Sequence, residues 1–185
     1  ARPPVLEPGA PTGWTVGSGL DALGLRHFPD GGFGFTFGPT TAIGSSYLLP
    51  VFHAGVVLDG SLVLGGNVEL GYVHLNPDGP GAPDANLGLI GIVPFVEYWF
   101  EGEDLAPFVG GHFGPSFTFA DGLDTRVWLT AGGRGGLHFF VGDSFSIGPT
   151  AEASFIYRSD SERAGWELVF GISLRGWGGT GGGGG

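Results

Sequence analysis

The 185-residue chain contains no cysteine, no methionine and no lysine. The lack of cysteine excludes disulfide bonds and thiolate metal sites. All seven basic residues are arginines, and the net charge of −11 argues against nucleic-acid binding. No apolar run reaches about 18 residues, so no membrane-spanning helix is predicted. The chain begins at Ala1 and has no methionine there, so we expect a mature chain from which a signal peptide has been removed.

Glycine and strand-forming residues are abundant instead. The 40 glycines and 14 prolines disfavour helices, yet 42% of the residues are hydrophobic and the mean hydropathy is +0.22. An apolar, strand-rich chain without a membrane helix is typical of a β-barrel in lipid, because a closed barrel satisfies all its backbone hydrogen bonds internally.

The stretch 86–119 shows the pattern most clearly. Two runs of about 15 residues flank the polar turn Glu101-Gly-Glu-Asp104, whereas strands of soluble sheets usually have about five or six residues. Alternate residues such as Ile92 and Val96 form an apolar face, and the other face of the second run carries small and polar residues such as His112 and Ser116. This alternation predicts a transmembrane hairpin with an apolar exterior and a polar interior.

The same alternation predicts eight strands between residues 31 and 177, near 32–41, 46–58, 61–75, 86–100, 105–119, 125–141, 144–158 and 164–176. Tight turns at 59–60, 101–104 and 142–143 occur at every second connection, as in outer-membrane barrels. We therefore predict an all-β fold, an eight-stranded antiparallel up-and-down transmembrane β-barrel. Residues 1–30 are expected to form a Pro/Gly-rich periplasmic N-terminal segment, and residues 178–185 a Gly-rich C-terminal tail.

Charged residues on the predicted inner faces lie at similar heights above their turns. They could form one layer in the lumen, comprising Glu69, His112, Arg134, Glu152 and Glu167. Arg134 and Glu152 are expected to pair across one hairpin, because a charge in a narrow lumen needs a partner. This layer is interpreted either as a salt-bridged plug or as a gated polar path for protons or small ions.

Aromatic residues gather near the expected membrane–water interfaces, where rings with an apolar body and a polar tip are favoured. The predicted girdle comprises Tyr72, Tyr98, Phe100, Phe117, Phe119, Phe139, Phe145, Tyr157, Trp166 and Trp177.

Three segments carry a family resemblance: Pro94-Phe-Val-Glu-Tyr-Trp-Phe100, Pro107-Phe-Val-Gly-Gly-His-Phe-Gly114 and Val169-Phe-Gly-Ile-Ser-Leu-Arg-Gly-Trp177. With the strand pattern over 31–177, they resemble the small bacterial outer-membrane β-barrel proteins, the OmpA-like and OmpX-like group. The last segment looks like the C-terminal signal by which such barrels are recognised for insertion. The resemblance implies a barrel in the bacterial outer membrane, surrounded by its lipid and lipopolysaccharide.

The sequence offers little support for chemistry. None of the five histidines has a defensible Ser/His/acid spacing, so we expect no catalytic residue and no enzyme. No metal site or cofactor is expected, because no EF-hand or nucleotide-binding motif is present. The preferred function is a structural or interaction role, as a membrane-embedded subunit or anchor whose protein partner contacts the N-terminal segment or the glycine tail. The alternatives are a narrow channel for small solutes or ions, and a soluble lipocalin-like barrel with an apolar interior.

Overall fold

The computed structural model describes residues 13–27, 33–37, 42–43, 51–75, 85–120, 124–159 and 162–179; the side chains of some strand residues, Glu69 and Tyr72 among them, lie outside the description. In these ranges every regular element is a β-strand, and no helix there is long and apolar enough to cross a bilayer. The eight barrel strands are β1 (Gly13–His27), β4 (Val51–Leu58), β5 (Leu62–Leu75), β6 (Ala85–Trp99), β7 (Leu105–Ala120), β8 (Arg126–Phe140), β9 (Phe145–Arg158) and β10 (Arg163–Gly179).

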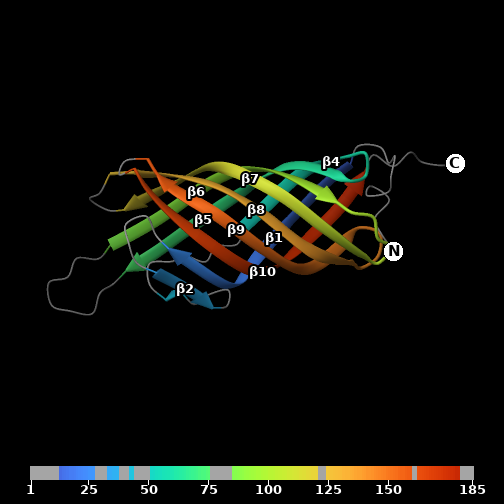
Figure 1. Cartoon of the computed structure of the whole chain (residues 1–185), viewed down its shortest axis with the longest axis horizontal. Coiled ribbons are helices and arrows are strands. Elements are labelled where there is room, and N and C mark those ends of the chain that lie inside the picture. The colour runs from blue at the N-terminus through green and yellow to red at the C-terminus, as the bar shows by residue number, and fades with distance from the viewer. Residues whose placement is uncertain are drawn as a thin grey trace.

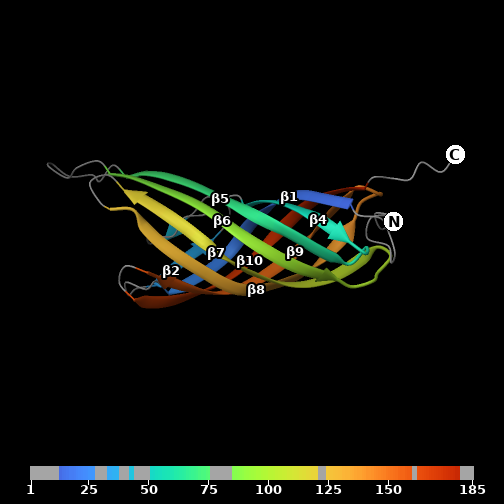
Figure 2. The same cartoon turned by 90° about the horizontal axis from the view of Figure 1, so that it is seen from above.

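All neighbouring barrel strands are antiparallel, and β10 pairs with β1, so the sheet closes on itself (Figure 1). The strands run obliquely to the long axis of the barrel in both views (Figures 1 and 2). Such tilt is required to close a sheet of this size, and it explains why 14–17 residues are needed in most strands. The predicted all-β, eight-stranded antiparallel barrel is confirmed.

Side chains alternate between the two sides of the wall, and most of those that point outward are apolar. Ile92, Phe155 and Phe170 are 58%, 71% and 50% exposed. Glu97 and Arg175, in contrast, are fully buried in the interior. This distribution is the reverse of that in a soluble barrel, so the lipocalin-like alternative is wrong. An apolar exterior far larger than a typical surface patch is what the hydrocarbon of a bilayer requires.

Three short turns lie at one end of the barrel, which we call the turn end. They join β4 to β5, β6 to β7 and β8 to β9, as the sequence predicts. Asp59 and Gly60 both have positive φ, 49° and 66°, which suits the tight right-twisted hairpins favoured by Asp-Gly. Gly13 pairs with Gly179 at this same end, so β1 starts where β10 finishes. The opposite end, which carries the remaining connections, is the loop end.

The N-terminal boundary of the barrel was predicted wrongly. Residues 1–30 were expected to lie outside the barrel, but residues 13–27 form β1, which closes it between β10 and β4. The segment predicted as the first strand, 32–41, contributes β2 (Phe33–Phe37), which pairs with the loop-end half of β1, and β3 (Ala42–Ile43) pairs with β2. The count of eight remains correct because one strand replaces the other.

The other strand limits agree closely with the prediction. In the second predicted strand, 46–58, the structure exposes Phe52 and Val56 and buries His53 and Val57. Residues 46–50 lie outside the described residues, as do 1–12 and 180–185. Gly178 and Gly179 of the predicted tail are the last residues of β10.

Candidate functional site

Three charged side chains meet in the interior, and we call them the ion cluster. Glu97 on β6 accepts two hydrogen bonds from Arg175 on β10, with Nη1 2.6 Å from Oε2 and Nη2 2.7 Å from Oε1. Arg134 on β8 places Nη2 2.6 Å from Glu97 Oε1 as a second ion pair. The indole of Trp99 donates to Glu97 Oε2 at 3.1 Å. One buried carboxylate therefore holds two guanidinium groups, which is the geometry in which a planar bidentate arginine binds strongly.

Aromatic rings surround the same guanidinium groups. The Arg175 guanidinium lies 5.0 Å from the ring centre of Trp99, 5.2 Å from that of Phe108 and 6.0 Å from that of Trp177. Arg134 lies 4.2 Å above Phe95. A ring face attracts a cation, and more strongly where water is excluded, so the rings help to stabilise charges that have left water.

Below the ion cluster, towards the turn end, the interior is filled by apolar side chains. This floor cluster comprises Val57, Val63, Trp99, Ala106, Phe108, Phe140 and Trp177, and it continues past Glu97 towards the loop end through Phe95. Trp99 stacks on Phe108 at 4.8 Å and meets Trp177 edge-on at 4.8 Å. An eight-stranded barrel leaves an interior that side chains can just fill, and here large rings fill it near one end.

Histidine and serine side chains link the floor cluster to the wall. His138 on β8 lies 2.9 Å from Ser146 Oγ through Nδ1 and 2.6 Å from Ser173 Oγ through Nε2. The Trp177 indole donates to the same Ser146 Oγ at 2.8 Å. These buried polar atoms are therefore paired, as buried groups in native proteins usually are.

A second polar layer lies on the loop-end side of the ion cluster. Ser154 on β9 donates to Glu152 Oε1 at 3.1 Å and lies 3.0 Å from His112 Nε2. His112 Nε2 is itself 3.5 Å from Glu152 Oε1. The Glu152 side chain is 29% exposed, whereas that of Glu97 is completely buried. Water can therefore reach the level of Glu152, whereas the Glu97 carboxylate is shielded from it.

The structure brings most of the predicted lumen layer to one region. Arg134 faces Glu152 in the β8–β9 register, and Glu167 faces Ser154 in the β9–β10 register. His112 completes the group, whereas the side chain of Glu69 lies outside the described residues. Arg134 forms an ion pair with Glu97. The functional role of this layer stays a prediction.

Glu97, the centre of the interior, is absent from the predicted lumen layer. Its position was readable, because the alternation that puts Val96 and Tyr98 outside puts Glu97 inside. What sequence could not supply was its partner, since Arg175 is 78 residues away and on the opposite wall.

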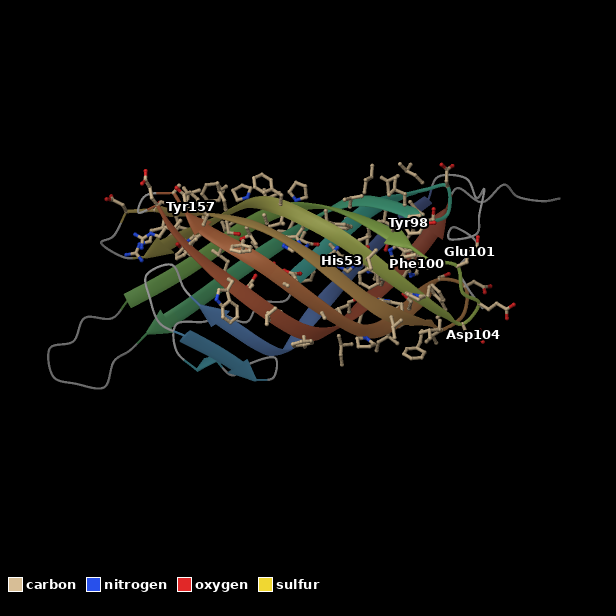
Figure 3. All side chains as sticks on the ribbon, viewed as in Figure 1. His53, Tyr98, Phe100, Glu101, Asp104 and Tyr157 are labelled. Carbon is tan, nitrogen blue, oxygen red and sulfur yellow. The ribbon has the colours of Figure 1, made fainter. Side chains whose placement is uncertain are left out.

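The aromatic girdle is present in part. Tyr98, Phe100, Phe139 and Phe145 are exposed towards the turn end, while Phe119 and Tyr157 are exposed towards the loop end; Figure 3 labels Tyr98, Phe100 and Tyr157. Phe117 and Trp166 are half-buried, and the side chain of Tyr72 lies outside the described residues.

The assignment of Trp177 to this girdle is wrong. Trp177 is 3% exposed and belongs to the floor cluster, because it shares the inner face of β10 with Ser173 and Arg175. The alternation along β10 predicts that Trp177 points inward. Only the aromatic character of Trp177 had suggested a place on the outer face.

The interior offers poor geometry for catalysis. His112, Ser154 and Glu152 are linked, but Glu152 contacts the serine and the same His112 nitrogen, and His112 Nδ1 has no hydrogen-bond partner. In a Ser/His/acid relay the acid holds the other imidazole nitrogen. Among the described residues no three His, Asp or Glu side chains are grouped to hold a metal ion.

Comparisons with known proteins agree with the architecture. No protein-family model and no curated protein sequence matches the chain. The crystal structure of Neisserial surface protein A (NspA) superposes with a TM-score of 0.62 at 12% identity, covering 89% of this chain and 96% of NspA. Matches to OprG of Pseudomonas aeruginosa and to Ail of Yersinia pestis have TM-scores of 0.43 and 0.42 and identities of 10%. They cover 94% and 89% of this chain and 97% of each of those chains.

The match to NspA supports the fold, because its TM-score is well above 0.5 and NspA is covered almost completely. NspA is a small eight-stranded outer-membrane barrel, and the resemblance seen in the sequence is confirmed for the fold. Closure of β1 on β10, an outer face that is mostly apolar and short turns at one end agree with that match. The chain has the fold of the small outer-membrane β-barrel proteins.

Proposed function

We propose that this protein resides in the bacterial outer membrane and has a structural or interaction role there, as a membrane-embedded subunit or anchor of a larger assembly. The apolar exterior supports the membrane location, because exposed side chains such as Ile92, Phe113 and Phe155 would be unfavourable in water over so large a surface. Lipid, lipopolysaccharide included, then surrounds the wall.

The closed interior is the observation that carries the proposed role. Trp99, Phe108 and Trp177 fill the lumen near the turn end, and the ion cluster above them is satisfied largely within itself. A lumen occupied in this way leaves the turns, loops and terminal segments as the parts that can engage other molecules. Glu101 and Asp104, in the turn between β6 and β7, are exposed at the turn end (Figure 3).

The test is affinity purification from detergent-solubilised membranes, comparing the full chain with variants lacking residues 1–12 or 180–185. The proposal expects a defined co-purifying protein whose recovery falls at least tenfold in one of the two deletions. A variant with the exposed Phe155→Leu change serves as the control, since it leaves both termini intact. Recovery of the barrel alone in all preparations would contradict the assembly role.

A narrow channel is the second candidate, and specific observations favour it. Arg134 Nε has no hydrogen-bond partner, and its Nη2 meets Glu97 at ion-pair distance without hydrogen-bond geometry. Arg134 Nη1 donates a long hydrogen bond of 3.5 Å to Asn67 Oδ1, whereas Arg175 makes two short bonds to Glu97, although Arg175 Nε also has no partner. A movable Arg134 beside the half-buried Glu152 could open a polar path.

Single-channel recording distinguishes the two functions. A structural role expects no conductance steps from the wild-type protein or from Arg134→Ala, because the floor cluster still fills the lumen. A channel expects wild-type steps that change in size or open probability in Arg134→Ala and not in the turn variant Glu101→Ala. Folding of each variant is checked by circular dichroism before recording.

A further inference from the structure

The ladder of backbone hydrogen bonds between β6 and β7, which we call the β6–β7 seam, is interrupted about halfway along the two strands. Pairing runs from Leu87 opposite Ala120 to Gly91 opposite Ser116, and resumes at Phe95 opposite His112 in the same register. The unpaired interval is residues 92–94 against 113–115. On its other side β6 pairs with β5 continuously from Leu62 opposite Tyr98 to Leu75 opposite Ala85. The interruption therefore belongs to one seam and not to the whole strand.

Two prolines explain the interruption. Phe100 donates its backbone N–H to Pro107 O across this seam at 2.9 Å. Hydrogen-bonded pairs in an antiparallel ladder recur at every second residue, so Pro94 and Pro115 occupy positions whose amides would also point across this seam. Proline has no amide hydrogen to donate. Two successive pairs thus each lose one bond, and the carbonyls of Ile92 and Phe113 lose their donors.

Little else holds the seam at this level. On the lumen side the interval is lined by Val93 and Gly114, both buried, with Gly91 just beyond. Outside, Ile92 and Phe113 project into the surroundings and are 58% and 60% exposed. The ion cluster ties β6 to β8 and β10 through Glu97, but that contact lies nearer the turn end. Each of the two pairs therefore keeps at most one backbone hydrogen bond, and side-chain packing supplies the rest of the contact between the strands.

We propose that the barrel wall opens locally and reversibly at the β6–β7 seam over residues 92–94 and 113–115, while the β5–β6 seam stays closed. Lumen water, which reaches the level of Glu152, enters the separated ladder during opening. The interruption in the β8–β9 seam is smaller, because Pro149 alone falls between Gly136 opposite Thr150 and Phe139 opposite Ile147.

Alternate amides of β6 provide the measurement. The amides of Ile90, Ile92 and Val96 point towards β7, whereas those of Gly91, Val93 and Phe95 point towards β5. Hydrogen exchange of the wild-type protein in lipid nanodiscs, read by NMR residue by residue, should be at least tenfold faster at Ile92 than at Val93. Equal exchange on the two sides of β6 would overturn the proposal, because it would mean that the strand loosens as a whole or not at all.

Restoring the missing donors provides the second test. Pro94→Ala and Pro115→Ala each add one amide to the seam, and each should slow exchange at Ile92 and Phe113 about fivefold, the factor that corresponds to one net hydrogen bond. Pro149→Ala is the matched control, since it restores one donor to the β8–β9 seam and should leave Ile92 unchanged. An equal slowing by Pro149→Ala, or none by the two seam variants, would contradict a local opening.

Discussion

Replacing Glu97 by glutamine tests whether the ion cluster stabilises the barrel. The change keeps the shape of the side chain but removes the one negative charge that Arg134 and Arg175 contact at 2.6 Å. At an effective dielectric constant of about 20, unit charges about 4 Å apart attract by about 4 kcal/mol, so two gross attractions of that order disappear. Glutamine still offers one oxygen, which recovers part of the hydrogen bonding.

The net loss is smaller than the gross attraction because folding had to desolvate all three groups. Removing one partner of a buried ion pair typically costs about 3–5 kcal/mol, because a buried charge is left uncompensated. Here two arginines are left, so we expect Glu97→Gln to lower the free energy of unfolding by an amount at the upper end of that range. The double variant Glu97→Gln with Arg134→Met should recover part of the loss, since it removes one of the two stranded charges.

Unfolding by guanidinium chloride in detergent micelles, followed by tryptophan fluorescence, measures this difference in the free energy of unfolding. Trp99 donates to Glu97 and therefore reports on the cluster itself. Glu101→Gln in the exposed turn is the control and should stay within about 0.5 kcal/mol of wild type. A Glu97→Gln protein less than about 1 kcal/mol below wild type would refute the view that the cluster is a coupled, desolvated unit.

Three further outcomes are expected. Ala153→Arg places a charge on the outer face near the middle of β9 and should cost about 2–4 kcal/mol for unfolding from lipid vesicles, against about 0.5 kcal/mol or less at a water-facing site. Phe108→Ala opens a cavity beside Trp99, so it should lower the free energy of unfolding by about 3–5 kcal/mol and weaken the near-ultraviolet circular dichroism signal. An unchanged free energy of unfolding with an unchanged signal would contradict tight packing of the floor cluster. Gly142→Ala meets no neighbouring atom, but its φ of 71° should cost about 1 kcal/mol in the same unfolding assay.

The interior layer shows how far strand alternation reaches. Alternation placed Arg134 and Glu152 inside and opposite one another, because hairpin register follows from the short turn at 142–143. The same rule places Arg175 inside, where the structure has it. The same rule predicts that Trp177 points into the lumen, as it does in the structure. Only the preference of aromatic residues for membrane–water interfaces led to its wrong assignment to the outer face.

The N-terminal error has a different origin. Strand β1 has four glycines among its fifteen residues and a register shift between Asp21 and Leu23, so its alternation is weak when read along the sequence. Its pairing partner is β10, at the other end of the chain. Nothing local to residues 13–27 indicates that closure occurs there rather than at 32–41.

The sequence by itself determined the all-β class, the side of the wall that is apolar and the end that carries the short turns. These properties depend on alternation and turn residues, which are local. Only the tertiary structure decided which strand closes the barrel and which carboxylate holds the two arginines. The reason is that Glu97, Arg134 and Arg175 lie on strands that do not pair with each other, so their contact exists only after the sheet has curled into a cylinder.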